Sequence, residues 1–161
     1  MIAQLDTMPD HARLWVYQAG RKLSDQEIQQ VAIRTTTFLE QWAAHGQELR
    51  AAFEIKFNQF LVIAVDESMH GASGCSIDSC VGMVRELEQA LSVSFMDRTK
   101  VALLDDDKVQ LVNLKEIRSN ISSGTISEKT VVTNNAVSSY GDFKKSWALP
   151  ATKSWVARYF D

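Results

Sequence analysis

The positions of hydrophobic and polar residues predict three strands in the first half of the chain. Residues 13–18 are rich in aromatic and β-branched types, which is typical of a strand. Residues 52–57 alternate apolar and polar side chains, which predicts a strand at a sheet edge with one buried face. The run 60–65 is apolar without alternation and predicts a strand covered on both faces that forms a hairpin with 52–57.

Two helices are predicted around this hairpin. Ser24 stands three residues before Glu27, the spacing of a capping box, and apolar residues then recur at the helical period as far as Trp42. Gly46 is expected to stop this helix, because glycine adopts a left-handed conformation at little cost. The second helix is predicted from about Ser76 to Ser92, with a buried stripe formed by Ile77, Cys80, Val81, Val84, Leu87 and Leu91.

The order of these elements favours an α+β fold of the ferredoxin-like type. A fourth strand is predicted over 99–104 and a fifth over 109–112, with an acidic turn between them. The order βαββαβ with an added strand predicts an antiparallel sheet that has two helices on one face and its first and third strands at the centre. We expect a single domain over residues 1–161, with a core over about 12–112.

The remaining residues, about 113–161, are expected to form a C-terminal α/β extension. The pattern predicts a short helix over 114–123 ended by Gly124, a strand over 130–133 and a helix over 140–147. Clustered aromatic side chains are expected to dock this tail onto the body of the protein or onto a second subunit. These aromatic residues are Phe143, Trp147, Trp155, Tyr159 and Phe160.

Composition and charge narrow the classes of partner. The chain has 161 residues, of which 45% are hydrophobic and 23% charged, as in soluble globular proteins. The formal net charge of −3 argues against nucleic acid as a partner, although Trp15 and Tyr17 on a predicted strand leave single-strand binding as an alternative. No basic leader and no apolar run of membrane-spanning length is present, so we expect a cytoplasmic protein with no membrane contact.

The segment 66–80 has the most site-like chemistry. It follows an apolar strand and opens a helix, where backbone N–H groups lack partners. Cys75 lies within one turn of this helix start, a position that stabilises a thiolate. His70 or His45 is a candidate base, and Asp66 or Glu67 is a candidate group to orient it. The alternative is that Cys75 is a small buried apolar residue.

The same turn is also a candidate anion site. Ser73, Gly74 and Ser76 would let a phosphate or carboxylate approach the backbone at the helix start. Arg21 and Arg98, and His45 at the end of the first helix, would complete the site if the fold brings them to this turn. The alternative is a tight strand-to-helix turn that needs glycine for its conformation alone.

No metal or cofactor is predicted. Cys75 and Cys80, taken with His70, do not match the spacings of zinc sites, and the acidic run 105–107 lacks the spacing of a calcium loop. The two cysteines are five residues apart at a helix start, where their side chains point in different directions. We therefore expect two free thiols.

Several blocks of the chain resemble a family of short uncharacterised bacterial proteins. Members of this family often carry the automatic label "ABC transporter ATPase", and the resemblance implies nothing beyond that label. The chain has no Gly-x-x-x-x-Gly-Lys-Ser/Thr loop, which an ATPase of that class needs to hold phosphates. The resembling blocks are residues 15–18, 21–24, 41–46, 53–55, 65–67 and 72–79.

Two functional hypotheses follow. The first is a non-enzymatic binding or interaction module that assembles as a homodimer through its sheet or aromatic tail and holds a small anionic ligand at Ser73–Ser76. The second is a cysteine-dependent enzyme or thiol-redox protein that uses Cys75.

Overall fold

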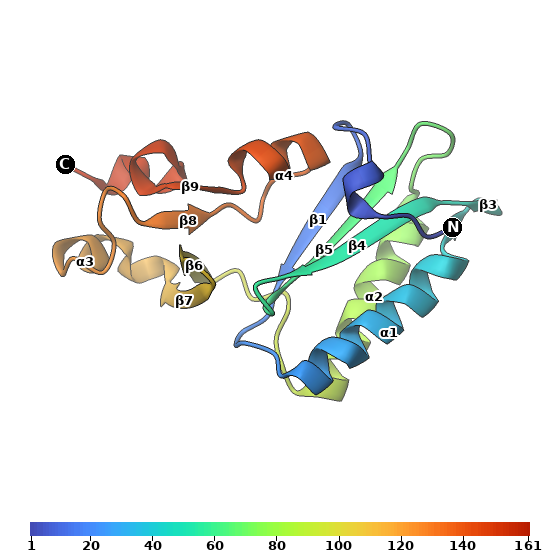
Figure 1. Ribbon diagram of the computed structural model, residues 1–161, viewed down its shortest axis with the longest axis horizontal. Helices are drawn as coiled ribbons and strands as arrows, with labels where there is room; N and C mark the ends of the chain where they lie inside the picture. The colour runs from blue at the N-terminus through green and yellow to red at the C-terminus, as the bar shows by residue number, and fades with distance from the viewer.

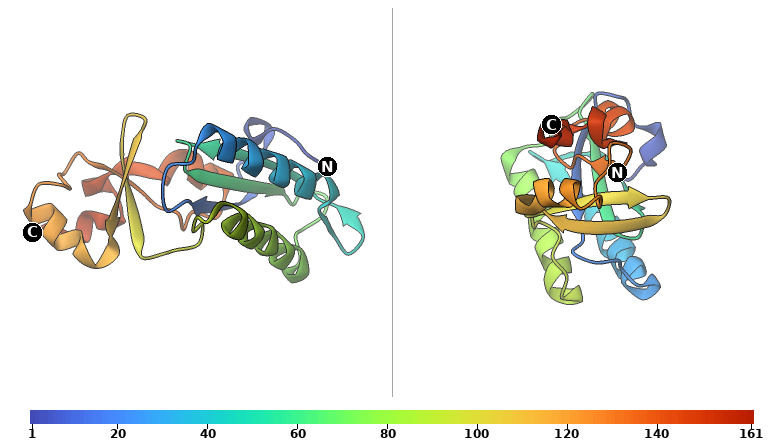
Figure 2. Two further views of the ribbon diagram at one scale, coloured as in Figure 1. Left: turned by 90° about the horizontal axis from the view of Figure 1, so that it is seen from below. Right: turned by 90° about the vertical axis from the view of Figure 1, so that its left-hand side faces the viewer.

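The computed structural model describes all 161 residues and contains two antiparallel sheets of three and four strands beside a small two-stranded hairpin. Two long helices cover one face of the first sheet (Figure 1). The two termini lie at opposite ends of an elongated molecule (Figure 2). No helix is long and apolar enough to cross a membrane.

The first sheet has the strand order β1-β5-β4. Its central strand is apolar throughout and completely buried, except at Asp66. The alternating strand lies at the edge, so both placements agree with the sequence pattern. The three strands are β1 (Arg13–Gln18), β4 (Arg50–Lys56) and β5 (Phe60–Asp66), and the helices are α1 (Asp25–Gln41) and α2 (Gly74–Leu91).

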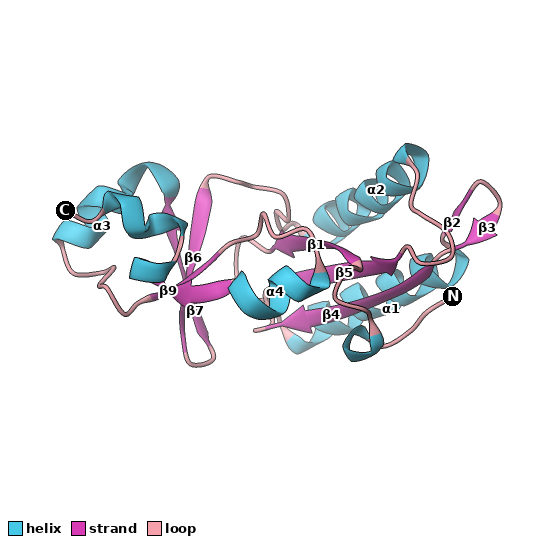
Figure 3. Ribbon diagram, turned by 90° about the horizontal axis from the view of Figure 1, so that it is seen from above, coloured by secondary structure: helices cyan, strands magenta, loops and turns pink.

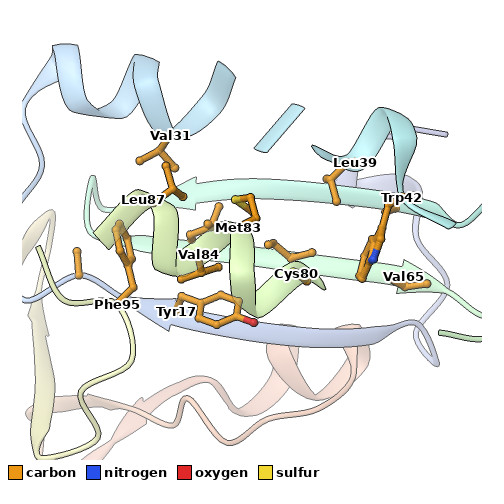
Figure 4. Packing of buried hydrophobic residues seen from close by; sticks show 14 of the residues in the cluster. Tyr17, Val31, Leu39, Trp42, Val65, Cys80, Met83, Val84, Leu87 and Phe95 are labelled. Carbon is orange, nitrogen blue, oxygen red and sulfur yellow. The ribbon is translucent and has the colours of Figure 1, made fainter. Parts of the chain in front are cut away.

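Both helices begin with the caps that their sequences encode. Ser24 accepts a hydrogen bond from the Glu27 N–H and the Glu27 carboxylate accepts one from the Ser24 N–H, which confirms the capping box. The apolar stripes of α1 and α2 then pack on the sheet as one core (Figure 4). Its labelled members are Tyr17, Val31, Leu39, Trp42, Val65, Cys80, Met83, Val84, Leu87 and Phe95.

Gly46 does not end α1, which stops at Gln41. His45 and Gly46 both have positive φ, 52° and 77°, and form the two-residue turn of a small hairpin. The left-handed conformation expected of this glycine therefore serves a β-turn. The strands of this hairpin are β2 (Ala43–Ala44) and β3 (Gln47–Glu48).

The α+β class is confirmed, but the ferredoxin-like strand order is not. The fourth predicted strand, β6 (Lys100–Asp105), belongs to a second sheet of order β7-β6-β8-β9. In that sheet β6 pairs with β7 on one side and with β8 on the other, so it is not available to β1. The outer edge of β1 instead has an isolated β-bridge between Arg13 and Ser139. β1 is consequently an edge strand. The other strands of the second sheet are β7 (Lys108–Asn113), β8 (Val131–Thr133) and β9 (Ala148–Pro150).

The C-terminal extension packs against both sheets. Phe143 and Trp147 enter a core that joins the second face of the first sheet to the second sheet. Trp155, Tyr159 and Phe160 pack on the opposite side of the second sheet. Its helices are α3 (Ile117–Ser122) and α4 (Tyr140–Ser146), with the 3-10 turns η2 (Leu114–Glu116), η3 (Ala151–Lys153) and η4 (Trp155–Tyr159).

The N-terminal segment covers part of the β4 edge. Ile2 forms a parallel bridge with Ala51, and the terminal ammonium of Met1 donates to the Leu49 carbonyl at 3.0 Å. The chain then forms the 3-10 turn η1 (Leu5–Thr7), whose Leu5 is buried in the core shared by the two sheets.

Candidate functional site

The turn at the start of α2 is satisfied largely by its own side chains. Ser73 Oγ accepts from the Ser76 N–H at 3.1 Å, and Ser76 Oγ accepts from the Ser73 N–H at 2.8 Å. The Ser76 hydroxyl also donates to the Ser73 carbonyl at 2.8 Å. This reciprocal arrangement uses donors that a bound anion would need. Both serines therefore act as helix caps.

A carboxylate already lies beside this turn. Glu67 Oε2 accepts from the Ala72 N–H at 2.8 Å and lies 3.1 Å from the position that a Cβ on Gly71 would occupy. A negative charge at the start of a helix interacts favourably with its dipole, and it repels a second anion. The local charge thus opposes phosphate or carboxylate binding next to Gly74.

The structure does not bring the predicted arginines to the turn. Arg21 forms a bidentate pair with Glu27, at 2.8 Å for both bonds, and donates to the Leu91 carbonyl at the far end of α2. A helix of 18 residues separates Leu91 from the turn by about 27 Å. Arg98 is exposed and lies beyond that same far end. His45 is on the near side, but it is exposed and forms no hydrogen bond.

No base is hydrogen-bonded to the Cys75 thiol. This thiol is exposed. The one side-chain hydrogen bond to Cys75 is donated by the Ser79 hydroxyl to the Cys75 backbone carbonyl. His70 is exposed and has no hydrogen-bond partner. Cys80 is buried against Tyr17, and burial raises the pKa of its thiol to about 12 (Figure 4). Both cysteines are free, but the predicted group of Cys75, His70 and Asp66 is not assembled.

Asp66 has other partners: Ser68, which is close in the chain, and two residues from distant segments. It accepts from Arg50 Nη1 at 3.1 Å and from the Ser68 N–H at 3.0 Å. Hydrogen bonds from the Ser68 hydroxyl and backbone, and then from Arg50, lower the pKa of this carboxyl. His11 approaches the same group, with Nε2 at 4.0 Å from Asp66 Oδ1. The sequence gives no signal for Arg50 or His11, because neither is near Asp66 in the chain.

Ser68, His11 and Asp66 do not form a catalytic triad. In a triad the histidine accepts the serine proton on one ring nitrogen and donates from the other nitrogen to the carboxylate. Here His11 Nε2 lies 3.0 Å from Ser68 Oγ, and the same nitrogen faces Asp66. The Ser68 hydroxyl itself donates to Asp66 Oδ1. The group is a polar network at the end of the sheet. No cluster of three His, Cys, Asp or Glu side chains could hold a metal ion.

A shallow cavity of about 380 Å³ lies between β4 and α4 and is lined by aromatic rings. Lys56 Nζ lies 5.6 Å from the Phe143 ring centroid and 5.9 Å from that of Trp147. Glu54, on the same face of β4, also lines this cavity. Neither Glu54 nor Lys56 forms an ion pair within the chain. Two opposite charges two residues apart are therefore without ionic partners on one edge strand.

β4 is one of the two outer strands of the first sheet (Figure 3), and the backbone groups along part of its outer edge have no partner in the chain. Backbone groups of successive residues in an antiparallel pair point alternately toward and away from the neighbour. The backbone groups of Ala51 point away from β5: the Ala51 N–H donates to the Met1 carbonyl at 3.0 Å, and the Ala51 carbonyl accepts from the Ala3 N–H at 2.7 Å. By alternation the backbone groups of Phe53 and Ile55 also point outward, and they have no partner in the chain.

Comparison with known proteins adds no assignment. No protein-family model matches the chain, and neither a curated protein nor a solved structure matches it. The resemblance to short bacterial proteins stays a prediction.

Proposed function

We propose that this chain is an interaction module that accepts an extended strand at the free part of the β4 edge. One observation carries the proposal: the outward backbone groups of Phe53 and Ile55 have no partner, whereas those of Ala51, on the same edge, are paired with the N-terminal segment. This edge thus already accepts one added segment. An extended strand laid beside Phe53 and Ile55 would continue the sheet.

The side chains along this edge support the proposal. Phe53 and Ile55 pack against the core of α1 and α2 but remain partly accessible to solvent. The strand contains no proline and no bulge, devices that commonly block unwanted pairing at sheet edges. An incoming strand would therefore gain backbone hydrogen bonds and apolar contact together.

A display experiment with extended peptides tests the proposal. Peptides are selected on the immobilised full chain, and their affinities for wild type and for Ile55→Pro are then compared. Ile55→Pro removes one outward N–H and leaves the inward bonds to β5 in place. Ile55→Val is the matched control, because it keeps the N–H and the β-branched shape. We expect Ile55→Pro to lose at least about tenfold in affinity and Ile55→Val to bind as wild type. Equal binding to folded Ile55→Pro would place the peptides elsewhere and reject the proposal.

A further inference from the structure

The free edge of β4 is short, and this limits how a strand can pair with it. The N-terminal segment occupies the edge at Ala51. At the other end Phe57 and Asn58 turn away with positive φ of 54° and 53°. Only the stretch from Phe53 to the turn is open, so a pairing strand must match a brief sequence.

That brief sequence is complementary to itself. Glu54 and Lys56 share one face of the strand, carry opposite charges and have no ion-pair partner in the chain. Two antiparallel copies of β4 related by a two-fold axis at Ile55 would place Glu54 of each copy opposite Lys56 of the other. Opposite charges on facing cross-strand positions stabilise a pair of strands.

Two alternative registers are opposed, one by charge and the other by the occupied part of the edge. An axis at Glu54 would place the two Glu54 carboxylates opposite each other, and like charges at facing positions destabilise the pair. An axis at Phe53 would place Ile55 opposite Ala51, whose backbone groups are already bonded to Met1 and Ala3. Like charges thus oppose the register centred on Glu54, and the bonds of the N-terminal segment oppose the register centred on Phe53. The register centred on Ile55 is free of both.

We infer that the strand accepted by β4 is β4 of a second copy of this chain, paired antiparallel about Ile55 with two Glu54–Lys56 contacts across the axis. This inference rests on the proposed strand addition and names its partner. The Lys56 ammonium, which lies over Phe143 and Trp147, is then met by a carboxylate at the rim of the aromatic cavity. Because the shared edge is short, the dimer is of the weak, concentration-dependent class.

Sedimentation velocity of the full chain over a wide concentration range tests the inference, in a Cys75→Ser background that prevents disulfide-linked pairs. We expect a monomer–dimer equilibrium. Glu54→Lys alone and Lys56→Glu alone should each weaken the dimer by about tenfold or more, because each places like charges opposite each other. The double variant Glu54→Lys/Lys56→Glu restores opposite charges at the facing positions. Its dimer dissociation constant should return to within about threefold of the wild-type value.

The controls are Glu40→Lys and Lys145→Glu, which make the same charge changes at exposed positions away from the edge and should leave the dimer unchanged. Circular dichroism confirms that each variant is folded. A wild type that stays monomeric at all concentrations overturns the inference, and peptides that bind wild type but not Ile55→Pro would still uphold strand addition. A dimer that persists in Ile55→Pro lies elsewhere and also overturns it. Failure of the double variant to recover rejects the register.

Discussion

The indole Nε1 of Trp42 donates a buried hydrogen bond of 2.8 Å to the backbone carbonyl of Ser76. This bond ties the end of α1 to the first turn of α2, at the segment with the most site-like sequence. The Ser73–Ser76 capping box satisfies the same turn from within. The small residues and serines of this turn thus have a structural explanation, whereas the outward backbone groups of Phe53 and Ile55 on the β4 edge have no partner in the chain.

Loss of the Trp42 bond should measurably destabilise the fold. Trp42→Phe keeps an aromatic ring in the core but removes the donor, at an expected cost of about 1–2 kcal/mol in unfolding free energy. Urea denaturation measures this cost. The control is Trp15→Phe, because Trp15 lies 6.3 Å from Trp42 between ring centroids and its indole donates no hydrogen bond. Equal costs for the two variants would show that the bond contributes nothing.

Thr35 should be replaceable by valine with a gain in stability. Its side chain is fully buried in α1, and its Oγ1 has no hydrogen-bond partner. Thr35→Val keeps the shape and removes an unpaired hydroxyl, so we expect unfolding free energy to rise by about 1 kcal/mol. Thr37→Val, an exposed position on the same helix, should stay within about 0.5 kcal/mol of wild type. A destabilised Thr35→Val would indicate a partner for the hydroxyl.

The Arg21–Glu27 pair should make stability depend on pH in the acid range. Hydrogen bonds from Arg21, and then from the Ser24 backbone, lower the pKa of Glu27 to about 2 from its ordinary 4.5. A depressed carboxyl pKa stabilises the fold above pH 4.5, and the contribution disappears as pH falls from 4.5 toward 2. Thermal melts of wild type and Glu27→Gln should therefore differ at pH 7 and converge near pH 2. A difference independent of pH would contradict this assignment.

Gly141 and Gly82 should respond to alanine in opposite directions. A Cβ on Gly141 would lie 3.1 Å from both the Asp10 carbonyl oxygen and the Asp10 Cβ, so Gly141→Ala should cost about 1–3 kcal/mol. A Cβ on Gly82, in the middle of α2, would meet nothing within 4 Å, so Gly82→Ala should stabilise by about 0.5–1 kcal/mol. Chemical denaturation distinguishes the two signs. Similar effects would show that the approach of α4 to Asp10 is not tight.

Local sequence signals anticipated much of the fold, whereas long-range pairing escaped them. The cap at Ser24 and the alternation along β4 depend on nearby residues, so they can be read from sequence. The sheet in which β6 lies depends on partners that come later in the chain. β9 was missed because it is short and ends in Pro150, a residue disfavoured in strands.

The candidate site was anticipated less well, for the same physical reason. Segment 66–80 could be recognised as a strand-to-helix turn, but its true neighbours could not. Asp66 contacts Arg50 and His11, which reach it only in the folded chain. The edge position of β4 was visible in its alternation. Which part of that edge the N-terminal segment covers was not, because the bridge joins Ile2 to Ala51 across 49 positions.

Amide hydrogen exchange along β4 tests the open edge most directly. In dilute protein the Phe53 and Ile55 amides should exchange rapidly, because they point to solvent, while the Ala52 and Glu54 amides, which face β5, stay protected. Raising the protein concentration should selectively protect Ile55 as a second strand pairs with it. Protection of Phe53 and Ile55 equal to that of their neighbours at every dilution would show that the edge is already occupied and would contradict the account.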